Sequence, residues 1–502
     1  MFPRDLAPRF VATLLLCAVV AQPAAFAQPG AAPLPRRIDL GPADSSACTT
    51  DPAASTTIPG WRTIAGSPTL LCAEDDPLFA AHPEEARIGS GPYGASALER
   101  SVDLQAIAAA IDRGDATWAL SGWLGASGAG RARASLEAHF LDANGRTLQG
   151  AVRLDGPVAG VPDGGGRARA FASRDAHGAI PRVTRSLRLD LRFSNDDPAH
   201  DSAFADRLWL ALTPAVAVPA PRPPAAKVRR FDHVFLIMME NTGYEQVIGD
   251  LRDAPYINSL ARRGVLLSRY YAVYHPSDEN YLAIANGSAA VRGAVYFPKI
   301  HLRIRHLGDA LEAAHLSWRA YEQGMGTPCN TDTRFDKYYE PDDAPFVNYA
   351  NVIDDKRRCR EHLVDTKQLT RDLASASSTP NFAWIAADDY DDGEDAGNGS
   401  PHSLVVQDAW LRSTLEPLFA SPAWRRQRSL LILTWDESSQ IATNHVAAIV
   451  LGSRGSVRSG LLSTTRYDHY STARTIEAAL GLPALTANDR YAPAFDEAFT
   501  AR

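Results

Sequence analysis

The proline-rich segment from Thr213 to Arg230 divides this chain into two parts with different sequence patterns. Its five prolines block regular helix and sheet, which is typical of a semi-rigid spacer. The chain has 502 residues, more than a single hydrophobic core usually organises. We therefore expect a first domain over residues 28–213, a linker over residues 214–230 and a second domain over residues 231–502.

The N-terminus has the pattern of a cleavable secretory signal. Arg4 and Arg9 precede an apolar run from Phe10 to Val20, and the small-residue site Ala25-Phe26-Ala27 follows. The run is about half the roughly 20 residues that a membrane-spanning helix needs. We predict a signal over residues 1–27, an exported protein that is periplasmic or secreted, and no transmembrane segment.

Four cysteines remain after the predicted signal, and they are Cys48, Cys72, Cys329 and Cys359. An even number in a chain bound for an oxidising compartment indicates disulfides. Three pairings are possible, but the two near-neighbour pairs fall on opposite sides of the linker. This favours Cys48 with Cys72 and Cys329 with Cys359. A zinc site is the less favoured alternative, because no pair has the C-x-x-C spacing.

The composition is that of a globular protein, with 45% hydrophobic residues, 22% charged residues and a formal net charge of -7. A mildly acidic chain without basic clusters lacks the positive surface that binding to a phosphate backbone requires. We therefore exclude nucleic acid as a partner.

The part before the linker is predicted to be an all-β sandwich, because it contains short alternating runs bounded by Gly, Asp and Asn. These runs are Trp118–Leu124, Leu136–Leu141, Leu148–Leu154 and Leu187–Phe193. Four segments resemble the jelly-roll, galactose-binding-like modules of secreted bacterial enzymes, and they are Ile58–Thr63, Leu120–Gly125, Phe140–Gly145 and Ala205–Leu210. The resemblance implies either a glycan ligand or a plain spacer, since this fold serves both purposes.

The part after the linker is predicted to be α/β. Continuous apolar runs typical of strands buried on both faces are Val234–Met239, Leu430–Thr434 and Val446–Leu451. Helical spacing of apolar residues covers Tyr256–Arg263, Leu307–Ala314, Thr366–Ser375, Val406–Phe419 and Ser471–Leu480. Reactive groups in such sheets gather at the carboxyl ends of the strands. The polar residues that end the three predicted strands are therefore the first candidates for a site.

Two of these strands end in oxygen-bearing pairs, Glu240-Asn241 and Asp436-Glu437. Carboxylate and amide oxygens suit magnesium, calcium or manganese. Each pair alone could instead cap a helix or face solvent. Three carboxylates that converge without a cation would raise one another's pKa values, and a bound divalent metal resolves that arrangement.

Ser277 lies directly before an apolar, helical stretch in the segment His275–Gly287. One interpretation is an N-cap, in which its hydroxyl accepts a hydrogen bond from a free N–H of the helix. The other is a nucleophile, beside which the helix N-terminus holds a phosphoryl group and a metal favours the ionised hydroxyl. Both interpretations stay open at this point.

Several segments in family order, from about residue 231 to 485, resemble the bacterial phosphoesterase family of acid phosphatases and phospholipases C. They are Val234–Asn241, His275–Gly287, Trp318–Glu322, Pro380–Ile385, Leu433–Glu437 and Tyr467–Pro483. This family is part of the alkaline-phosphatase-like superfamily. The resemblance implies an alkaline-phosphatase-like sheet with helices on both faces and a metal-dependent hydrolase of phosphoric esters.

The resemblance also implies a ligand set and a nucleophile. Glu240, Asn241, Asp436 and Glu437 are expected to bind a divalent metal, with magnesium, calcium, manganese and zinc left open. Ser277 is expected to attack phosphorus.

Four further residues receive roles from the resemblance. Asn280 is expected to donate its amide to a non-bridging phosphate oxygen. His445 and His469 match histidines near the family's site, where one could protonate the leaving oxygen and another could hold the phosphate. His275, which contacts the substrate in this interpretation, is expected to be a positioning residue, with a catalytic acid as the alternative.

The chain departs from the family pattern at two places. Related chains often contain Asn-Asp-x-His where this one has Asp391-Asp-Gly-Glu394, and Glu279 stands where proline is frequent. Added carboxylates should weaken binding of a dianionic monoester, unless Asp392 and Glu394 serve as ligands of a further metal. The acidic run could equally be a solvated loop.

Three functions are left open by the sequence. The first is a secreted phosphomonoesterase or phosphodiesterase. The second is a phospholipase C that acts on lipid head groups, which requires an exposed apolar patch. The third is a glycan-binding surface protein with a degenerate hydrolase domain.

Overall fold

The fold is described from a computed structural model. The structure describes residues 37–72, 86–128, 131–158, 169–195, 197, 202–289, 301–333, 335–439 and 443–500. The predicted signal over residues 1–27 lies outside these residues. Within them, every helix is too short or too polar to cross a bilayer.

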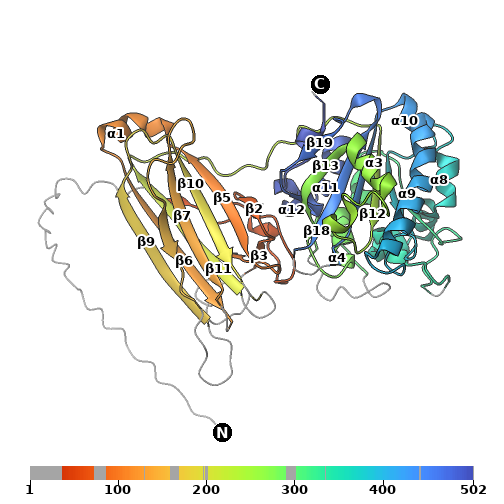
Figure 1. The fold of residues 1–502 in the computed structure, drawn as a ribbon, viewed down its shortest axis with the longest axis horizontal. Coiled ribbons are helices and arrows are strands. Elements are labelled where there is room, and N and C mark those ends of the chain that lie inside the picture. The colour runs from red at the N-terminus through yellow and green to blue at the C-terminus, as the bar shows by residue number, and fades with distance from the viewer. Residues whose placement is uncertain are drawn as a thin grey trace, which may run out of the picture. The chain divides into compact units, whose positions relative to one another are not determined.

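Two antiparallel sheets form the part before the linker (Figure 1). The first has the order β3-β4-β11-β6-β9 with β1 paired to β11. Its strands are β1 (Arg37–Asp39), β3 (Thr69–Leu71), β4 (Arg87–Gly89), β6 (Thr117–Ser127), β9 (Arg169–Ala179) and β11 (Ser202–Thr213). The second has the order β2-β5-β10-β7-β8. Its strands are β2 (Arg62–Ala65), β5 (Ser96–Asp103), β7 (Arg133–Leu141), β8 (Val152–Asp155) and β10 (Ser186–Ser194).

Alternating burial holds these sheets together. Along β10 the fully buried residues Leu187, Leu189 and Leu191 alternate with more polar positions, and they belong to one hydrophobic core with Leu120 and Leu136. Side chains of one parity face the core because the side-chain period of a strand is two. The all-β prediction agrees with this arrangement. The jelly-roll resemblance and the domain limits stay predictions.

One predicted strand of this part is too long. Leu148–Leu154 was expected to be extended throughout, but β8 begins at Val152. Residues 148–151 form no strand, although the backbone N–H of Leu148 donates to the carbonyl oxygen of Phe140 over 2.9 Å. Gly150 lies in this stretch, and glycine weakens a strand because it has no side chain to pack.

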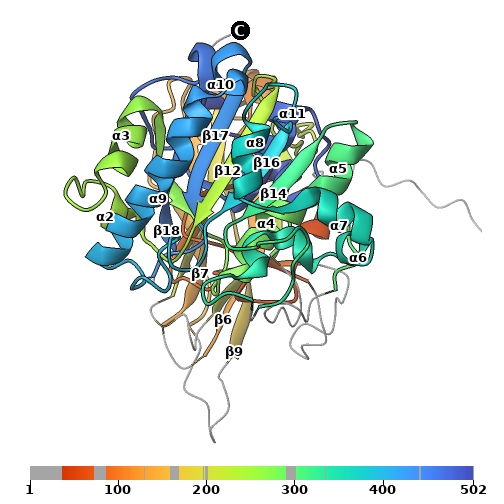
Figure 2. The same cartoon turned by 90° about the vertical axis from the view of Figure 1, so that its right-hand side faces the viewer.

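The part after the linker is built on a nine-stranded sheet (Figure 2). Its order is β15-β14-β16-β12-β17-β18-β13-β19, with β20 paired to β13. The strands are β12 (His233–Met239), β13 (Val265–Tyr271), β14 (Trp318–Glu322), β15 (Leu363–Asp365), β16 (Phe382–Ala386), β17 (Ser429–Trp435), β18 (His445–Gly452), β19 (Leu461–Ser463) and β20 (Tyr467–Asp468).

Helices cover both faces of this sheet. Successive side chains of a strand point to opposite faces, and every side chain of β12 and of β17 is buried, so both faces are covered. The helices of this part are α2 (Tyr244–Val247), α3 (Pro255–Arg263), α4 (Asp278–Asn286), α5 (Leu307–Ala313), α6 (Ala350–Ile353), α7 (Lys356–His362), α8 (Lys367–Asp372), α9 (Pro401–Ala420), α10 (Pro422–Arg426), α11 (His469–Leu480) and α12 (Ala487–Tyr491). A short helix, α1 (Ala108–Arg113), belongs to the first part. The α/β prediction is confirmed.

Two details of the α/β prediction were wrong. The expected helix over Thr366–Ser375 is shorter, since α8 ends at Asp372. The strand predicted at Val446–Leu451 runs antiparallel to β17, so its carboxyl end lies at the opposite edge of the sheet. The connection from Trp435 to His445 is too short for the crossover that a parallel pair requires.

Both expected disulfides are present. Cys48 is bonded to Cys72, 24 residues away, and Cys329 is bonded to Cys359, 30 residues away. Cys359 is completely buried, so this link is part of the packed interior of the α/β part.

Replacing both Cys48 and Cys72 by serine should lower the free energy of unfolding of the sandwich by about 3 kcal/mol, because the unfolded chain gains the freedom of an open loop. Denaturant unfolding monitored by tryptophan fluorescence measures the change. Wild-type protein with reductant is the control. A cross-link between either of these cysteines and Cys329 or Cys359 in unreduced peptide maps would contradict the pairing.

Candidate active site

Acidic residues follow neighbouring parallel strands of the nine-stranded sheet. The strands β14, β16, β12 and β17 are adjacent in this order, as Figure 2 shows. Glu322 ends β14, while Glu240 and Asp436 directly follow β12 and β17. The loop after β16 contains Asp392. Because the carboxyl ends of parallel strands meet at one edge, these carboxylates share one edge of the sheet.

Glu240, Asn241 and Asp436 are joined by short hydrogen bonds. The backbone N–H of Asn241 donates to Asp436 Oδ1 over 2.8 Å, and its side-chain Nδ2 donates to Glu240 Oε2 over 2.7 Å. Asn241 adopts a left-handed conformation with a φ of 48°, which asparagine tolerates better than most residues. The two predicted pairs are therefore brought together, although 195 residues separate them in sequence.

Ser277 precedes the first residue of α4 but does not cap the helix. Its backbone is helical, and its side chain makes no capping hydrogen bond. Its hydroxyl instead donates to Glu240 Oε2 over 3.1 Å. Of the two interpretations that the sequence left open, the side-chain cap is absent from this structure.

Tyr281 lies four residues after Ser277 and contacts the same carboxylate. Its hydroxyl donates a short hydrogen bond to Glu240 Oε1. Residues four apart on a helix share one face, so α4 presents two hydroxyls to the two oxygens of Glu240. Sequence reasoning missed Tyr281, and this spacing from the serine was the available signal.

Glu437 is paired with His275. Glu437 Oε2 lies 2.5 Å from His275 Nδ1, and burial lowers the pKa of His275. The contact holds Glu437 against His275, and the positioning role expected for His275 stays a prediction.

Asn280 is engaged inside the protein. Its Oδ1 accepts hydrogen bonds from the backbone N–H groups of Val273 and Tyr274, over 3.0 and 3.1 Å. Its Nδ2 donates to the carbonyl oxygen of Tyr274 over 3.1 Å. The amide therefore holds the loop before Ser277, and the structure does not offer it to a phosphate oxygen.

His469 touches the site through the backbone. It is fully buried, burial lowers its pKa to about 4, and its Nε2 donates to the carbonyl oxygen of Asp436 over 2.7 Å. The neutral ring accepts at Nδ1 from the hydroxyl of Tyr270 over 2.9 Å. The geometry makes His469 a support for the Asp436 backbone.

His445 is held outside this group. Its Nδ1 lies 2.8 Å from a carboxylate oxygen of Glu245, and its Nε2 lies 3.0 Å from the carbonyl oxygen of Ser268. The rings of Tyr244 and Tyr271 stack on it, with centroids 4.5 and 5.0 Å away. The structure does not bring His445 to the carboxylates, so its role as an acid stays a prediction without geometric support.

The acidic loop after β16 contributes one buried group. Asp392 is 1% exposed, and its Oδ1 accepts from the backbone N–H of Glu394 over 2.9 Å. Glu394 itself is exposed. Glu279 is buried in the first turn of α4, and burial raises its pKa to about 7.

Burial and mutual repulsion raise the pKa values of the site's carboxyl groups. Burial is the first cause and Asp436 the second for Glu240, whose pKa lies well above its ordinary value. Burial and then Glu394 raise the pKa of Glu437 to about 8. These shifts reflect the free-energy cost of ionising several buried carboxyl groups close together, a cost that a divalent cation would relieve.

The donor set fits a divalent metal. Asp436 is fully buried, and its Oδ2 has no hydrogen-bond partner among the described residues. An orphaned buried carboxylate oxygen is costly unless a cation meets it. Glu240, Asn241 and Glu437 add further oxygens, so the set suits a hard cation. The identity of the metal stays open.

Residues 250–483 match the model of the Phosphoesterase family. An acid phosphatase from Aspergillus fumigatus is 27% identical over 288 residues, which cover 55% of this chain and 61% of that protein. A phosphatidylinositol-3-phosphatase from Mycobacterium tuberculosis is 26% identical over 276 residues, which cover 55% of this chain and 84% of that protein. The match of residues 250–483 to the Phosphoesterase family agrees with the resemblance that the motifs indicated.

These similarities cover only part of each protein. The chain spans about three fifths of the length of the fungal acid phosphatases that it matches. A solved structure of a protein in the alkaline phosphatase superfamily from Vibrio parahaemolyticus has a TM-score of 0.40 and 12% identity, with 55% of this chain and 71% of that chain covered. This similarity carries no argument here, and the assignment of an α/β fold rests on the topology of the nine-stranded sheet.

Metal-free protein should lose thermal stability as the pH rises. Burial raises the pKa values of Asp278 and Glu437 to about 8 and that of Glu279 to about 7. Groups with a raised folded-state pKa stabilise the fold fully below their unfolded pKa of about 4, and this contribution is lost as the pH rises through 7 to 8.

Thermal melts in chelator at pH 5.5, 7 and 8.5 measure the effect. We expect the lowest melting temperature at pH 8.5 and a smaller fall in the presence of a divalent metal. A metal-free melting temperature that rises across this range would contradict the buried carboxylate arrangement.

Proposed function

We propose that this protein hydrolyses phosphoric esters, with Ser277 as the nucleophile in a divalent-metal site formed by Glu240, Asn241, Asp436 and Glu437. The main support for this proposal is the orientation of Ser277, because its hydroxyl makes no capping hydrogen bond and donates to Glu240 instead. The match of residues 250–483 to the Phosphoesterase family model supports it.

Ser277 is the proposed nucleophile, and Glu240 is the proposed acceptor of its proton. Ser277 Oγ forms the bond to phosphorus while the bond from phosphorus to the ester oxygen breaks, and the leaving oxygen takes the electron pair. The serine proton is directed at Glu240 Oε2, 3.1 Å away. Water then attacks the phosphoserine, releases phosphate and restores the hydroxyl. A bound divalent cation would supply positive charge that favours the ionised hydroxyl and offsets the phosphate charge.

Surrounding residues hold these groups in place. Tyr281 donates to the second oxygen of Glu240, which fixes that carboxylate relative to α4. His469 supports the backbone of Asp436, and His275 orients Glu437. We assign all three as positioning residues.

The substrate class is part of the proposal. The relatives described as acid phosphatases and as a phosphatidylinositol-3-phosphatase make a phosphatase reaction the best-supported choice for this chain. The carboxylates around Ser277 disfavour a dianionic ester unless metal offsets their charge. A phospholipase C reaction, a glycan ligand of the sandwich and export from the cell stay predictions.

Replacing Asp436 by asparagine or Glu240 by glutamine should remove the bound metal and most of the activity, because each change deletes a charged oxygen ligand. Elemental analysis after exchange into metal-free buffer measures the metal. Asp354→Asn and Glu361→Gln, both at exposed positions, are matched controls. Unchanged metal content in both site variants would show that the ligand set is wrong.

Replacing Ser277 by asparagine should abolish turnover while the protein stays folded. A serine that only donates a structural hydrogen bond to Glu240 would tolerate asparagine, because the side-chain amide keeps a donor. A nucleophile would not, and turnover on a chromogenic phosphate ester should fall by several orders of magnitude. Ser277→Thr keeps a hydroxyl and should retain part of the rate.

Acid quenching of wild-type protein during turnover should also trap phosphate on the peptide that contains Ser277. Ser277→Ala is the second control, since a purely structural hydrogen bond to Glu240 predicts a loss of about 1 kcal/mol of stability and little loss of rate. Full activity of Ser277→Asn without trapped phosphate would refute the nucleophile.

A further inference from the structure

An arginine of the sandwich lies on the side of its sheet that faces the hydrophobic core. Leu98 and Val102 of β5 are no more than 1% exposed and belong to that core, and Arg100 lies between them with the same side-chain parity. Arg100 itself is 7% exposed. The residue opposite Arg100 on β10 is Leu189, a further member of the core. A charged side chain therefore interrupts an apolar surface.

The guanidinium group of Arg100 has no partner within the described part of the chain. The side chain makes no hydrogen bond and no ion pair there, and its Nη1 is buried without a hydrogen-bond partner. Burial lowers the pKa of Arg100, although the charge of Asp39 partly opposes this shift. Arginine keeps its proton in proteins, so a buried positive charge is left unbalanced at this position, which is unfavourable.

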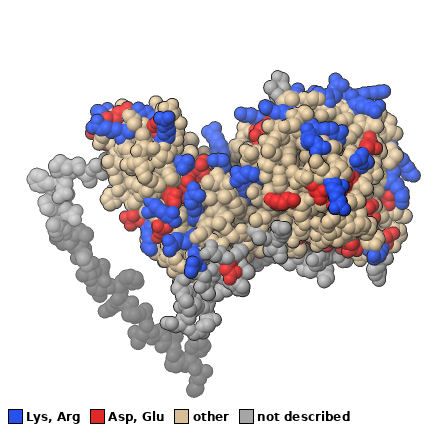
Figure 3. All heavy atoms as spheres, viewed as in Figure 1, with Lys and Arg blue, Asp and Glu red and all other residues tan. Residues whose placement is uncertain are grey.

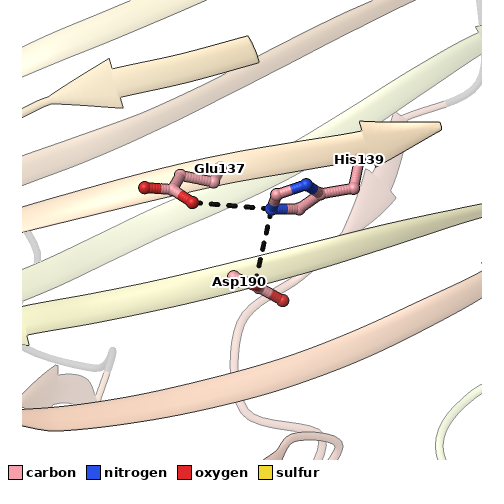
Figure 4. Close-up of side chains that lie close together, drawn as sticks. All are labelled: Glu137, His139 and Asp190. Carbon is pink, nitrogen blue, oxygen red and sulfur yellow. Dashed lines mark ion pairs between the residues drawn. The ribbon is translucent and has the colours of Figure 1, made fainter. Parts of the chain in front are cut away.

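The other face of the same sheet has arginines with acidic partners. Figure 4 shows three neighbouring side chains of that face, which are Glu137, His139 and Asp190. Arg153 lies 2.9 Å from Glu137, and Arg192 lies 3.0 Å from Asp190. On the face of the molecule drawn in Figure 3, basic and acidic side chains are likewise interspersed. The unpaired arginine on the core-facing side differs from this pattern.

Arg100 lines a cavity of about 740 Å³. The cavity belongs to the compact unit Arg36–Arg502, and residues of the sandwich, the linker and the α/β part form its walls. Apolar and aromatic side chains of these walls are Trp61, Val102, Val218, Pro221, Tyr491 and Pro493. The indole Nε1 of Trp61 donates to the carbonyl oxygen of Leu40 over 2.8 Å, which fixes this ring. A cavity of this size with apolar walls is typical of a small-molecule site.

The charged residues around the cavity leave an excess of positive charge, because four arginines and three carboxylates line it. Glu99 is already paired, since its Oε1 lies 2.8 Å from a guanidinium nitrogen of Arg62. Asp103 and Asp468 each accept a hydrogen bond from a backbone N–H, two and three residues further along the chain. The three carboxylates are thus engaged elsewhere, and none of them balances Arg100.

Arg466 is the second buried arginine that lines the cavity, and it is 9% exposed. Its Nη2 donates to the carbonyl oxygen of Gly66, and its Nη1 lies 3.4 Å from a carboxylate oxygen of Asp468. Its guanidinium group also lies over the ring of Tyr271, 4.8 Å from the centroid. Its Nε is buried without a hydrogen-bond partner among the described residues. Arg466 is therefore mostly engaged by the protein, and Arg100 is the arginine available to a ligand.

We propose that this cavity binds a small organic anion, with its oxyanion group on Arg100 and its apolar body against Trp61 and Tyr491. The guanidinium fork matches a carboxylate, sulfate or phosphate group, and such charge-assisted hydrogen bonds are stronger than those between neutral groups. Water alone would solvate the N–H groups but would leave the charge of Arg100 unbalanced. The apolar walls favour a ligand with a hydrophobic or ring-shaped body over a bare ion.

The cavity is separate from the proposed catalytic site. None of the described residues that line it belongs to the proposed metal ligand set, and Ser277 does not line it. Binding of an organic anion therefore goes beyond ester hydrolysis, and its test needs no turnover.

Isothermal titration calorimetry of the chelator-treated full chain with benzoate tests the proposal, with benzyl alcohol and inorganic sulfate as comparison ligands. Benzyl alcohol keeps the ring without the charge, and sulfate keeps the charge without the ring, so each should bind about tenfold or more weakly than benzoate. Arg100→Gln should weaken benzoate binding by about tenfold or more, because it removes the charged fork. Arg192→Gln, on the other face of the same sheet, is the matched control and should bind benzoate as wild type does.

Asp436→Asn protein should also bind benzoate as wild type does, so this proposal and the proposed catalytic function fail separately. A benzoate affinity no higher than that of benzyl alcohol, or one that Arg100→Gln leaves unchanged, would overturn the proposal. Absence of saturable benzoate binding to wild type would overturn it as well, in favour of a cavity that holds water only.

Melting temperatures separate loss of binding from misfolding. In buffer without benzoate or sulfate, Arg100→Met should melt at or above the wild-type temperature, because an apolar side chain replaces an unpaired buried charge between Leu98 and Val102. Benzoate should raise the melting temperature of wild type and leave that of Arg100→Met unchanged. Equal benzoate-induced shifts in the two proteins would count against the site.

Discussion

Repulsion among buried carboxylates is the constraint on which the catalytic half of this protein depends. Glu240, Asp436, Asp392 and Glu322 are each no more than 2% exposed, and they lie along one edge of a single sheet. Water cannot screen these charges, so each carboxylate either binds a proton or meets a cation. Among the described residues, none of the four forms an ion pair with a lysine or arginine, and this supports the proposal that a divalent metal binds here.

The sheet explains how these groups converge without strain. The parallel strands β14, β16, β12 and β17 are adjacent in this order, so their carboxyl ends, each at or followed by an acidic residue, lie at the same edge of the sheet. The rigid, fully buried strands fix the spacing of the carboxylates. Helix α4 then approaches this edge with its N-terminus and brings Ser277 and Tyr281 to Glu240. The proposed ligands and the proposed nucleophile therefore come from separate elements, and tertiary packing fixes their relative positions.

Much of this arrangement could be predicted from local sequence. The apolar run Val234–Met239 lacks only the first residue of β12, and Leu430–Thr434 lacks one residue at each end of β17. The agreement is close because continuous apolar stretches have few alternatives to a buried strand. The pairing of Glu240 with Asp436 followed from adjacent strand ends. The same reasoning applied to the strand Trp318–Glu322 would have found Glu322.

Other features could not be read from the chain. Asp343 lies in a segment without periodicity, 46 residues before Asp389, and only tertiary packing brings them together. Asn280 stands where the family resemblance implies a phosphate donor, but its partners are backbone groups of a loop that sequence does not place. The resemblance supplied residue identities, whereas contacts decided what each residue can do. This applies equally to His445, whose ring lies between two tyrosines.

The contacts of the histidines determine how much positive charge they can offer to a phosphate ester. With His469 supporting a backbone carbonyl and His445 engaged by Glu245, His275 is the single imidazole among the described residues that contacts the catalytic carboxylates. Burial lowers its pKa, so it contributes little positive charge at neutral pH. A phosphate ester is an anion and would meet carboxylates on several sides. If the site binds metal as proposed, metal ions would supply most of the binding free energy of the ester, and their charge would set how much anionic charge the site can accept.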